Sequence, residues 1–245
     1  MRRRVSSIVS ISPAAREPAL SFFHAGPAPQ ATGPRPGALR DGLNLMPGMT
    51  VGLFGGSFNP AHDGHAHVAE TAIQRLDLDR VVWLVSPQNP LKDATQTAPL
   101  AQRMASARAV APGPRMIVSD FETRTGTRWT IDTLRALKAR HPGVRFVWLM
   151  GSDNLENFHR WRGWTDIMRM MPVAVVARPG SLLESRAAPA ARRFAGHRVS
   201  SREARLLAHM QAPAWTYLRA PLNPSSSTAL RDRNRSSSEG PRPER

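Results

Sequence analysis

Two histidines three residues apart follow a pair of glycines in residues 55–65, which read Gly-Gly-Ser-Phe-Asn-Pro-Ala-His-Asp-Gly-His. The glycines would let the backbone approach an anion closely, and His62 and His65 could donate hydrogen bonds to it from imidazole nitrogens. A helix that begins near Gly64 would add free backbone N–H groups and the positive end of its dipole. The combination indicates a phosphate-binding loop, with the candidate residues Gly55, Gly56, Ser57, Phe58, Asn59, His62 and His65.

The histidines of this segment admit a second interpretation, in which His62, His65 and His67 hold a metal ion. This interpretation is weaker, because the compact zinc motif places two histidines four residues apart on one helix, with an acidic partner. The chain also contains no cysteine, which excludes disulfides and thiolate zinc sites. We therefore expect no metal site that the protein builds by itself.

A second polar group lies near the end of the chain, where Ser226, Ser227 and Thr228 precede Arg231. Hydroxyl groups at the start of a helix cap its free amides, and an arginine one turn later adds a planar, charged donor. Taken alone, this pattern is typical of an ordinary capped helix. Together with the first loop, it predicts a second anion site and a substrate that carries several phosphates.

The elements that must position these residues form a regular alternation of apolar strands and amphipathic helices. Such an alternation is typical of βαβ units, so the predicted fold class is α/β, a doubly wound parallel sheet. Ligands of such sheets bind beyond the carboxyl ends of the strands, where the candidate loops lie. The expected strands are residues 50–54, 80–86, 116–119, 146–150, 173–177 and 215–218, and the expected helices are residues 64–76, 99–110 and 130–140.

The composition predicts one domain with disordered ends. Residues 1–48 are rich in Pro, Ala, Gly, Ser and Arg and are expected to form a disordered extension, and residues 236–245 a disordered tail. The globular domain then spans residues 49–235. Within it, the sequence pattern does not indicate how residues 181–213 fold. Met46 and Met49 lie just before the first strand, so an upstream mistranslated start explains the extension as well as a function does.

The net charge of +16 suits either a protein that binds nucleic acid or an enzyme with polyanionic ligands. Many of the arginines lie in the terminal segments or on helix faces, where such residues are usually solvated. No recognised DNA- or RNA-binding module is present, so a specific nucleic-acid partner is not expected. No apolar run approaches the roughly 18 residues that a membrane span requires, and a cytoplasmic location is expected.

Residues 55–65 and 226–231 resemble the two signature motifs of the HxGH nucleotidyltransferase superfamily, with Leu230 where the family has isoleucine. The first motif is close to the form used by nicotinate-nucleotide adenylyltransferases. The resemblance runs from about Thr50 to Arg231. It implies a Rossmann-like nucleotidyltransferase fold and adenylyl transfer from ATP to nicotinate mononucleotide in NAD biosynthesis. It also implies that Mg²⁺ enters with ATP, bridging phosphate oxygens while it keeps several waters.

The resemblance also suggests roles for individual residues. His65 would bind the α-phosphate and His62 would orient it, while Arg231 with the three preceding hydroxyl residues would hold the β- and γ-phosphates. Trp129 stands where the family usually has tyrosine. Gly151 and Asp153 resemble the family's Gly-x-Asp near the nucleotide ribose, and the candidate residues for the mononucleotide are Asn59, Lys92, Thr130 and Trp161.

Several alternatives remain open at this stage. Asp153 could simply cap a helix, and Trp129 and Trp161 could be packing residues. Arg178, in an Arg-Pro-Gly turn, is left undecided. The acceptor could be nicotinamide mononucleotide or phosphopantetheine instead, and preference for the acid or the amide cannot be read from the sequence. A basic nucleic-acid-binding protein is the competing class.

Overall fold

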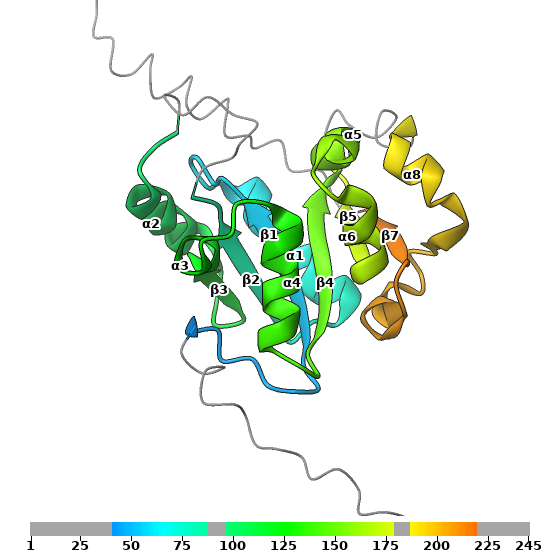
Figure 1. Cartoon of the computed structure of the whole chain (residues 1–245), viewed down its shortest axis with the longest axis horizontal. Coiled ribbons are helices and arrows are strands. Elements are labelled where there is room, and N and C mark those ends of the chain that lie inside the picture. Colours follow the sequence, from blue (N-terminus) through cyan, green and yellow to red (C-terminus); the bar gives the residue numbers. More distant parts are fainter. Residues whose placement is uncertain (1–40, 88–96, 179–186, 220–245) are drawn as a thin grey trace, which may run out of the picture. The chain divides into compact units, whose positions relative to one another are not determined.

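The computed structural model describes residues 41–87, 97–178 and 187–219. The chain divides into two compact units, residues 1–35 and 36–245, and every described residue belongs to the second. Its centre is a seven-stranded sheet in the order β3-β2-β1-β4-β5-β7-β6, and each paired strand is parallel to its neighbour. The predicted doubly wound parallel sheet is therefore confirmed (Figure 1).

All six predicted strands are present, with ends that differ by at most two residues. The central strands β1, β2, β4, β5 and β7 are mostly buried, as expected for strands with helices on both faces, whereas the edge strand β3 is only partly buried. A seventh, two-residue strand was not predicted. The strands are β1 (Thr50–Gly56), β2 (Arg80–Val85), β3 (Met116–Ser119), β4 (Arg145–Gly151), β5 (Val173–Val176), β6 (Arg198–Val199) and β7 (Trp215–Leu218).

The three predicted helices are also confirmed, as α1 (Asp63–Leu76), α2 (Leu100–Val110) and α4 (Thr130–Arg140). α1 ends where Asp77 adopts a left-handed conformation. Shorter helical segments complete the described chain, and those after residue 187 lie in the region that the sequence left unassigned. They are α3 (Phe121–Thr125), α5 (Ser152–Asn157), η3 (Phe158–Arg160), α6 (Trp164–Met170), α8 (Pro189–Arg193), η4 (Ala195–His197) and η5 (Ala204–His209).

Alternate residues of each central strand point into two separate cores, one on each face of the sheet. In β4, Trp148 packs with α4, α5 and α6, whereas Val147 and Leu149 pack with α1, α2 and η5. Figure 1 shows α4 in front of the sheet and α1 behind it. Because the chain places helices on different faces after β1 and β4, the topological switch point lies between these two adjacent strands.

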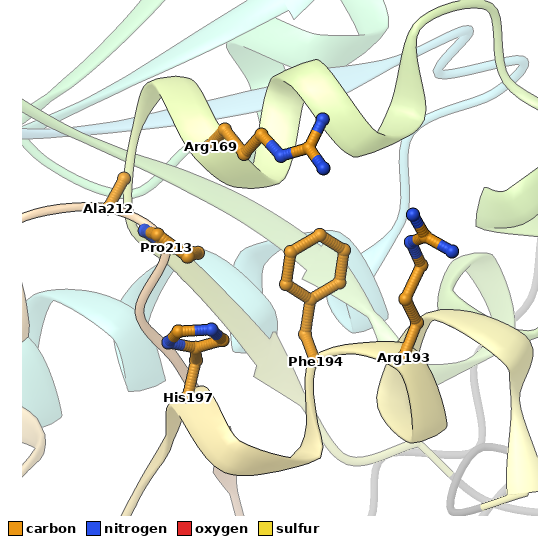
Figure 2. A pocket seen from close by; sticks show the side chains of 6 residues that line it. All are labelled: Arg169, Arg193, Phe194, His197, Ala212 and Pro213. Carbon is orange, nitrogen blue, oxygen red and sulfur yellow. The ribbon is translucent and has the colours of Figure 1, made fainter.

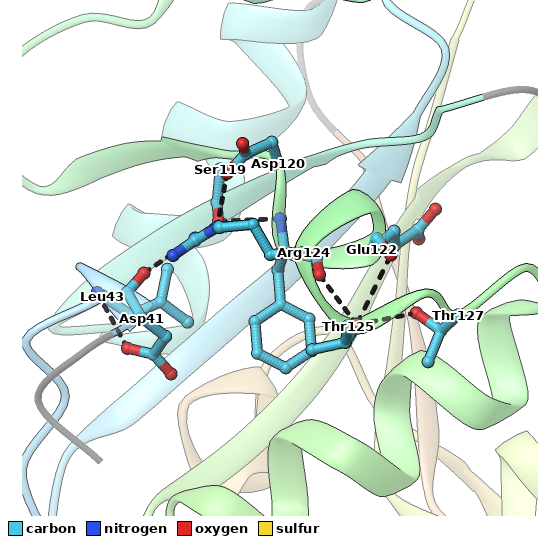
Figure 3. Close-up of polar contacts among 9 residues, drawn as sticks. Asp41, Leu43, Ser119, Asp120, Glu122, Arg124, Thr125 and Thr127 are labelled. Carbon is cyan, nitrogen blue, oxygen red and sulfur yellow. Dashed lines mark hydrogen bonds and ion pairs between the residues drawn. The ribbon is translucent and has the colours of Figure 1, made fainter. Parts of the chain in front are cut away.

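Residues 41–45 are packed into the domain, although the sequence assigned them to a disordered extension. Leu43 and Leu45 are core residues, 1% and 6% exposed. Asp41 Oδ2 lies 2.7 Å from His141 Nε2, with both side chains buried, and the Asp41 carbonyl accepts a hydrogen bond from Arg124 (Figure 3). These contacts were not visible in the sequence, because the partners of Asp41 lie 83 and 100 residues away along the chain.

No helix in the described part of the chain combines the length and the apolar character needed to cross a bilayer.

Candidate functional site

The predicted phosphate loop joins β1 to α1 at the carboxyl edge of the sheet, beside the switch point between β1 and β4. His62 is the N-cap residue of α1, and its Nδ1 accepts a hydrogen bond of 3.1 Å from the Gly64 N–H. His65 Nδ1 accepts one of 3.2 Å from the His62 N–H, which completes a capping box built from two histidines. Capping boxes usually use Ser or Thr with Glu or Gln, and here imidazole nitrogens act as the acceptors.

These two hydrogen bonds determine where the proton of each neutral ring lies. A ring nitrogen that accepts from a backbone N–H carries no proton, so the proton of the neutral imidazole is on Nε2. The two rings lie close together, 3.8 Å between centroids. The loop therefore holds two neighbouring Nε2–H donors at the start of a helix, as hydrogen bonding to a phosphate requires.

His62 is held in its neutral form. Burial is the main cause that lowers its pKa to about 4, and the positive charge of Arg178 lowers it further, against the opposing charges of Asp63 and Asp153. The side chain is only 4% exposed. At neutral pH, His62 is therefore a hydrogen-bond donor through Nε2 and carries no net charge.

Protein side chains fill the space beside the two glycines of the loop. A Cβ atom on Gly55 would collide with the ring of Trp148 in β4, and one on Gly56 would lie 3.1 Å from the ring of Phe58. The sequence assigned both glycines to the close approach of a phosphate. The packing supplies a separate reason for glycine at each position, and this reason holds with or without a ligand.

Among the predicted site residues that the structure describes, Phe58 has an almost fully buried side chain. It is 1% exposed and packs with Phe54, Trp83 and His65 at centroid distances of 5.6, 5.1 and 5.0 Å. Its backbone is left-handed, with φ of 46°. The Phe58 ring thus supports the His65 imidazole from the side of the core, and a nucleotide could meet only its backbone.

Three contacts with the α2 region fix the middle of the loop. Asn59 Oδ1 accepts a hydrogen bond of 3.2 Å from the Ala98 N–H, and the Ala61 N–H donates one of 3.0 Å to Ser106 Oγ. The Ser57 carbonyl accepts one of 2.8 Å from Arg103. Asn59 was predicted to bind the mononucleotide, and the structure places its carboxamide oxygen on this anchoring contact.

Arg103 holds the loop in place but was not among the residues predicted from the sequence, because arginines on helix faces were expected to be solvated. The side chain is 2% exposed and lies on the apolar face of α2 with Met104 and Ala107. Burial lowers the pKa of its guanidinium. A charged residue at helical spacing among apolar ones was the signal available in the sequence.

The predicted Gly-x-Asp segment follows β4 on the other side of the switch point. Asp153 forms an ion pair of 2.9 Å with Arg178, which follows β5, and the Arg178 N–H donates to Ser152 Oγ at 2.8 Å. A Cβ on Gly151 would collide with the Asp153 carboxylate and the Arg178 side chain. The N-cap of α5 is Gly151, with no side-chain cap, so Asp153 does not serve as the helix cap that was the alternative.

Trp161 and the phosphate loop share one neighbour, Trp148. The rings of Trp148 and Trp161 meet edge to face at 6.2 Å, and Trp148 also fills the space next to Gly55. Phe158 supports Trp161 from a second direction, at 5.4 Å. The half-buried Trp161, predicted to face the mononucleotide, is therefore connected to the loop through a single buried indole.

Thr130 begins α4, directly after Trp129, and neither residue provides a side-chain cap. The guanidinium carbons of Arg128 and Arg162 each lie 5.5 Å from the centre of the Trp129 ring, so two positive charges flank this indole. Nearby, burial raises the pKa of Glu122 to about 7, against a hydrogen bond to Thr133 that lowers it. Trp129 is thus in contact with two cations, and a buried carboxyl of raised pKa is hydrogen-bonded to Thr133 of α4.

Five predicted site residues lie outside the described residues, so their roles remain predictions. They are Lys92, Ser226, Ser227, Thr228 and Arg231.

A separate basic groove with a volume of about 610 Å³ lies between α6, α8 and η4. Figure 2 shows Phe194 at its centre, between the side chains of Arg169, Arg193 and His197. The six residues that line it include none of those predicted from the sequence, so this groove does not belong to the loop site.

Residues 53–233 match the model of a protein family described as cytidylyltransferase-like. A probable nicotinate-nucleotide adenylyltransferase of Caulobacter sp. (strain K31) is 66% identical over 185 residues, which cover 76% of this chain and 98% of that protein. A probable nicotinate-nucleotide adenylyltransferase of Methylorubrum extorquens (strain PA1) is 54% identical, over 76% of this chain and 100% of its own length.

The fold is also similar to that of a solved structure, Plasmodium falciparum nicotinic acid mononucleotide adenylyltransferase complexed with NaAD. The TM-score is 0.56, and the match covers 75% of this chain and 83% of that one. At 16% sequence identity, this similarity bears on the fold alone.

Proposed function

This chain belongs to the cytidylyltransferase-like family, among the nicotinate-nucleotide adenylyltransferases, and we propose that it transfers the adenylyl group of ATP to nicotinate mononucleotide. The products are nicotinate adenine dinucleotide and pyrophosphate, in NAD biosynthesis. An oxygen of the mononucleotide's 5′-phosphate bonds to the α-phosphorus of ATP. The bond from that phosphorus to the oxygen bridging to the β-phosphate breaks, and pyrophosphate leaves.

The reaction requires no nucleophile from the protein, because a phosphate monoester is already ionised near neutral pH. The protein must instead align two anions and stabilise the charge that develops around the phosphorus. The observation that carries the proposal is the capping box of His62 and His65, which directs both Nδ1 atoms to the backbone and leaves the protons on Nε2. His65 binds the α-phosphate in this mechanism, and His62 orients it.

The remaining candidate residues divide between the two substrates. Gly151 and Asp153 lie near the nucleotide ribose of ATP, and Arg231 with the hydroxyls before it holds the β- and γ-phosphates. Mg²⁺ is part of the substrate, carried on the phosphate oxygens of ATP. The donors on the loop are imidazole N–H groups, which suit phosphate oxygens, and the nearby Asp153 carboxylate is paired with Arg178.

The acceptor is the acid form of the nucleotide. Trp161, half-buried and supported by Trp148, offers an aromatic surface for a pyridine ring. Arg128 and Arg162 place two positive charges beside Trp129, which directly precedes α4. This charge favours a nicotinate carboxylate over a neutral carboxamide.

The test is an assay of the purified full-length protein with ATP and Mg²⁺ against three acceptors: nicotinate mononucleotide, nicotinamide mononucleotide and phosphopantetheine. Products are separated and identified by mass spectrometry. We expect nicotinate adenine dinucleotide and pyrophosphate in equal amounts, with the highest kcat/KM for the acid. Faster turnover of either other acceptor, or no turnover with any, would reject the proposed function.

A further inference from the structure

Arg103 connects three separate stretches of the chain at the carboxyl edge of the sheet. Its Nη1 donates to the carbonyl oxygens of Ser57 at 2.8 Å and Ser86 at 2.6 Å. Its Nη2 donates to the Pro87 carbonyl at 2.7 Å, and its Nε to the Ala98 carbonyl at 2.8 Å. A single side chain thus joins the phosphate loop, the end of β2 and the start of α2.

The buried guanidinium charge of Arg103 is balanced by carbonyl dipoles and by no carboxylate among the described residues. Each of the four acceptors is a backbone carbonyl oxygen, and within the described ranges Arg103 takes part in no ion pair. Burying a charge without a counter-charge is unfavourable unless its donors are well satisfied. Four short hydrogen bonds in the planar geometry of a guanidinium meet that condition, and they demand a specific arrangement of all three stretches.

The placement of these contacts concerns function as well as stability. Ser57 lies between Gly56 and the capping histidines, so the position of its carbonyl determines where the loop turns toward α1. Ser86 and Pro87 directly precede residues 88–96, which include the predicted mononucleotide residue Lys92. Arg103 therefore fixes the phosphate loop relative to the segment that leads to the other substrate.

We propose that Arg103 is a positioning residue for adenylyl transfer, which holds the His62–His65 loop in register with the end of β2 while touching neither substrate. Ser106, one turn later on α2, assists by accepting the hydrogen bond from the Ala61 N–H. This inference rests on the proposed function. A purely structural Arg103 would stabilise the fold without changing the kinetics of the molecules that are folded.

The test compares Arg103→Lys with Arg108→Lys, a matched control at an exposed position of the same helix. Lysine keeps the charge, but its single ammonium group cannot reach four carbonyls in a plane. For Arg103→Lys we expect kcat to fall by about tenfold or more, because misplacement of reacting groups by about 1 Å lowers rates strongly. Amide hydrogen exchange of residues 57–62 should become faster, and Arg108→Lys should match the wild type in both measurements.

Unchanged kcat and unchanged exchange in folded Arg103→Lys would overturn the proposal. If this variant does not fold, Arg103→Gln provides the decision, since its planar amide keeps some N–H donors toward the carbonyls and removes the buried charge. We expect faster exchange at Ser57, Phe58 and Asn59 and a lower kcat per folded molecule, and wild-type values for both would overturn the proposal. Wild-type protein inactive toward nicotinate mononucleotide would reject the proposed function instead, and loop positioning would still be judged from the exchange rates and the Kd for ATP.

Discussion

The Nδ1 atom of His65 accepts a hydrogen bond of 3.2 Å from the backbone N–H of His62, and the two imidazole rings lie 3.8 Å apart between centroids. Each histidine therefore has one nitrogen engaged with the start of α1 and one nitrogen that carries the proton. In the proposed mechanism, each side chain caps the helix through one nitrogen and donates a hydrogen bond to a phosphate through the other. Substitutions that keep an acceptor at the position of Nδ1 and remove the donor at Nε2 separate helix capping from phosphate binding.

His65→Asn should abolish most activity while the protein remains folded. The asparagine oxygen can take the place of Nδ1 as acceptor for the His62 N–H, but no group replaces the Nε2–H donor. We expect kcat to fall by about 100-fold or more, the usual effect of removing a donor that stabilises transition-state charge. Steady-state kinetics and thermal unfolding measure the two effects separately. The control is His67→Asn on the same helix, which should keep normal kcat. Near-normal kcat in folded His65→Asn would remove His65 from the mechanism.

The stability conferred by neutral His62 should depend on pH. Its folded pKa of about 4 lies below the unfolded value of 6.5, so between these pH values only the unfolded chain binds a proton. The contribution is fully present above pH 6.5 and is lost as the pH falls toward 4. In His62→Asn, which keeps a good N-cap and does not titrate, this loss should be absent. Urea unfolding of both proteins from pH 7 to pH 4 measures the difference in unfolding free energy. A difference that stays constant over this range would show that His62 is not held neutral.

Removing residues 1–47 should destabilise the domain, because it removes two core leucines and leaves His141 without its partner Asp41. Replacing one buried leucine by alanine usually lowers the free energy of unfolding by about 2–5 kcal/mol. For the loss of two leucines, we expect a decrease of at least about 4 kcal/mol. The composition of residues 1–40 predicts a much smaller effect for their removal alone. Urea unfolding of the two shortened chains distinguishes these expectations. Equal midpoints for both chains would mean that the packing of residues 41–45 contributes nothing.

Substitution of Arg231 should change the kinetic constants for ATP and leave the KM for the mononucleotide almost unchanged. Arg231→Ala is expected to raise KM for ATP and lower kcat, because contacts to the pyrophosphate act both on bound ATP and on the leaving group. Arg231→Lys should be impaired less, since it keeps the charge and loses the bidentate geometry. Kinetics with each substrate varied in turn provide the measurement. A selective rise in KM for the mononucleotide would place Arg231 at the other substrate.

The fold was predictable because its signals are local. Each of the six predicted strands is a short apolar run, each main helix shows apolar residues at helical spacing, and these periodicities follow from backbone geometry. The candidate phosphate loop was equally visible, since all its residues lie within residues 55–65. Even the capping role of the two histidines involves atoms no more than three residues apart.

The contacts that hold the site in place are of a different kind. Arg103 reaches Ser57 from 46 residues away, and Asp41 meets His141 across 100 residues. Trp148 fills the space beside Gly55 from another strand. A sequence pattern records which residues are apolar or charged, but not which distant segments pack together. The sequence by itself therefore determined six strands, the main helices and which residues make up the candidate loop. Only the tertiary structure decided which charges are buried, which polar groups are partners and where the packed chain begins, because burial and pairing arise when separate segments exclude water from one another.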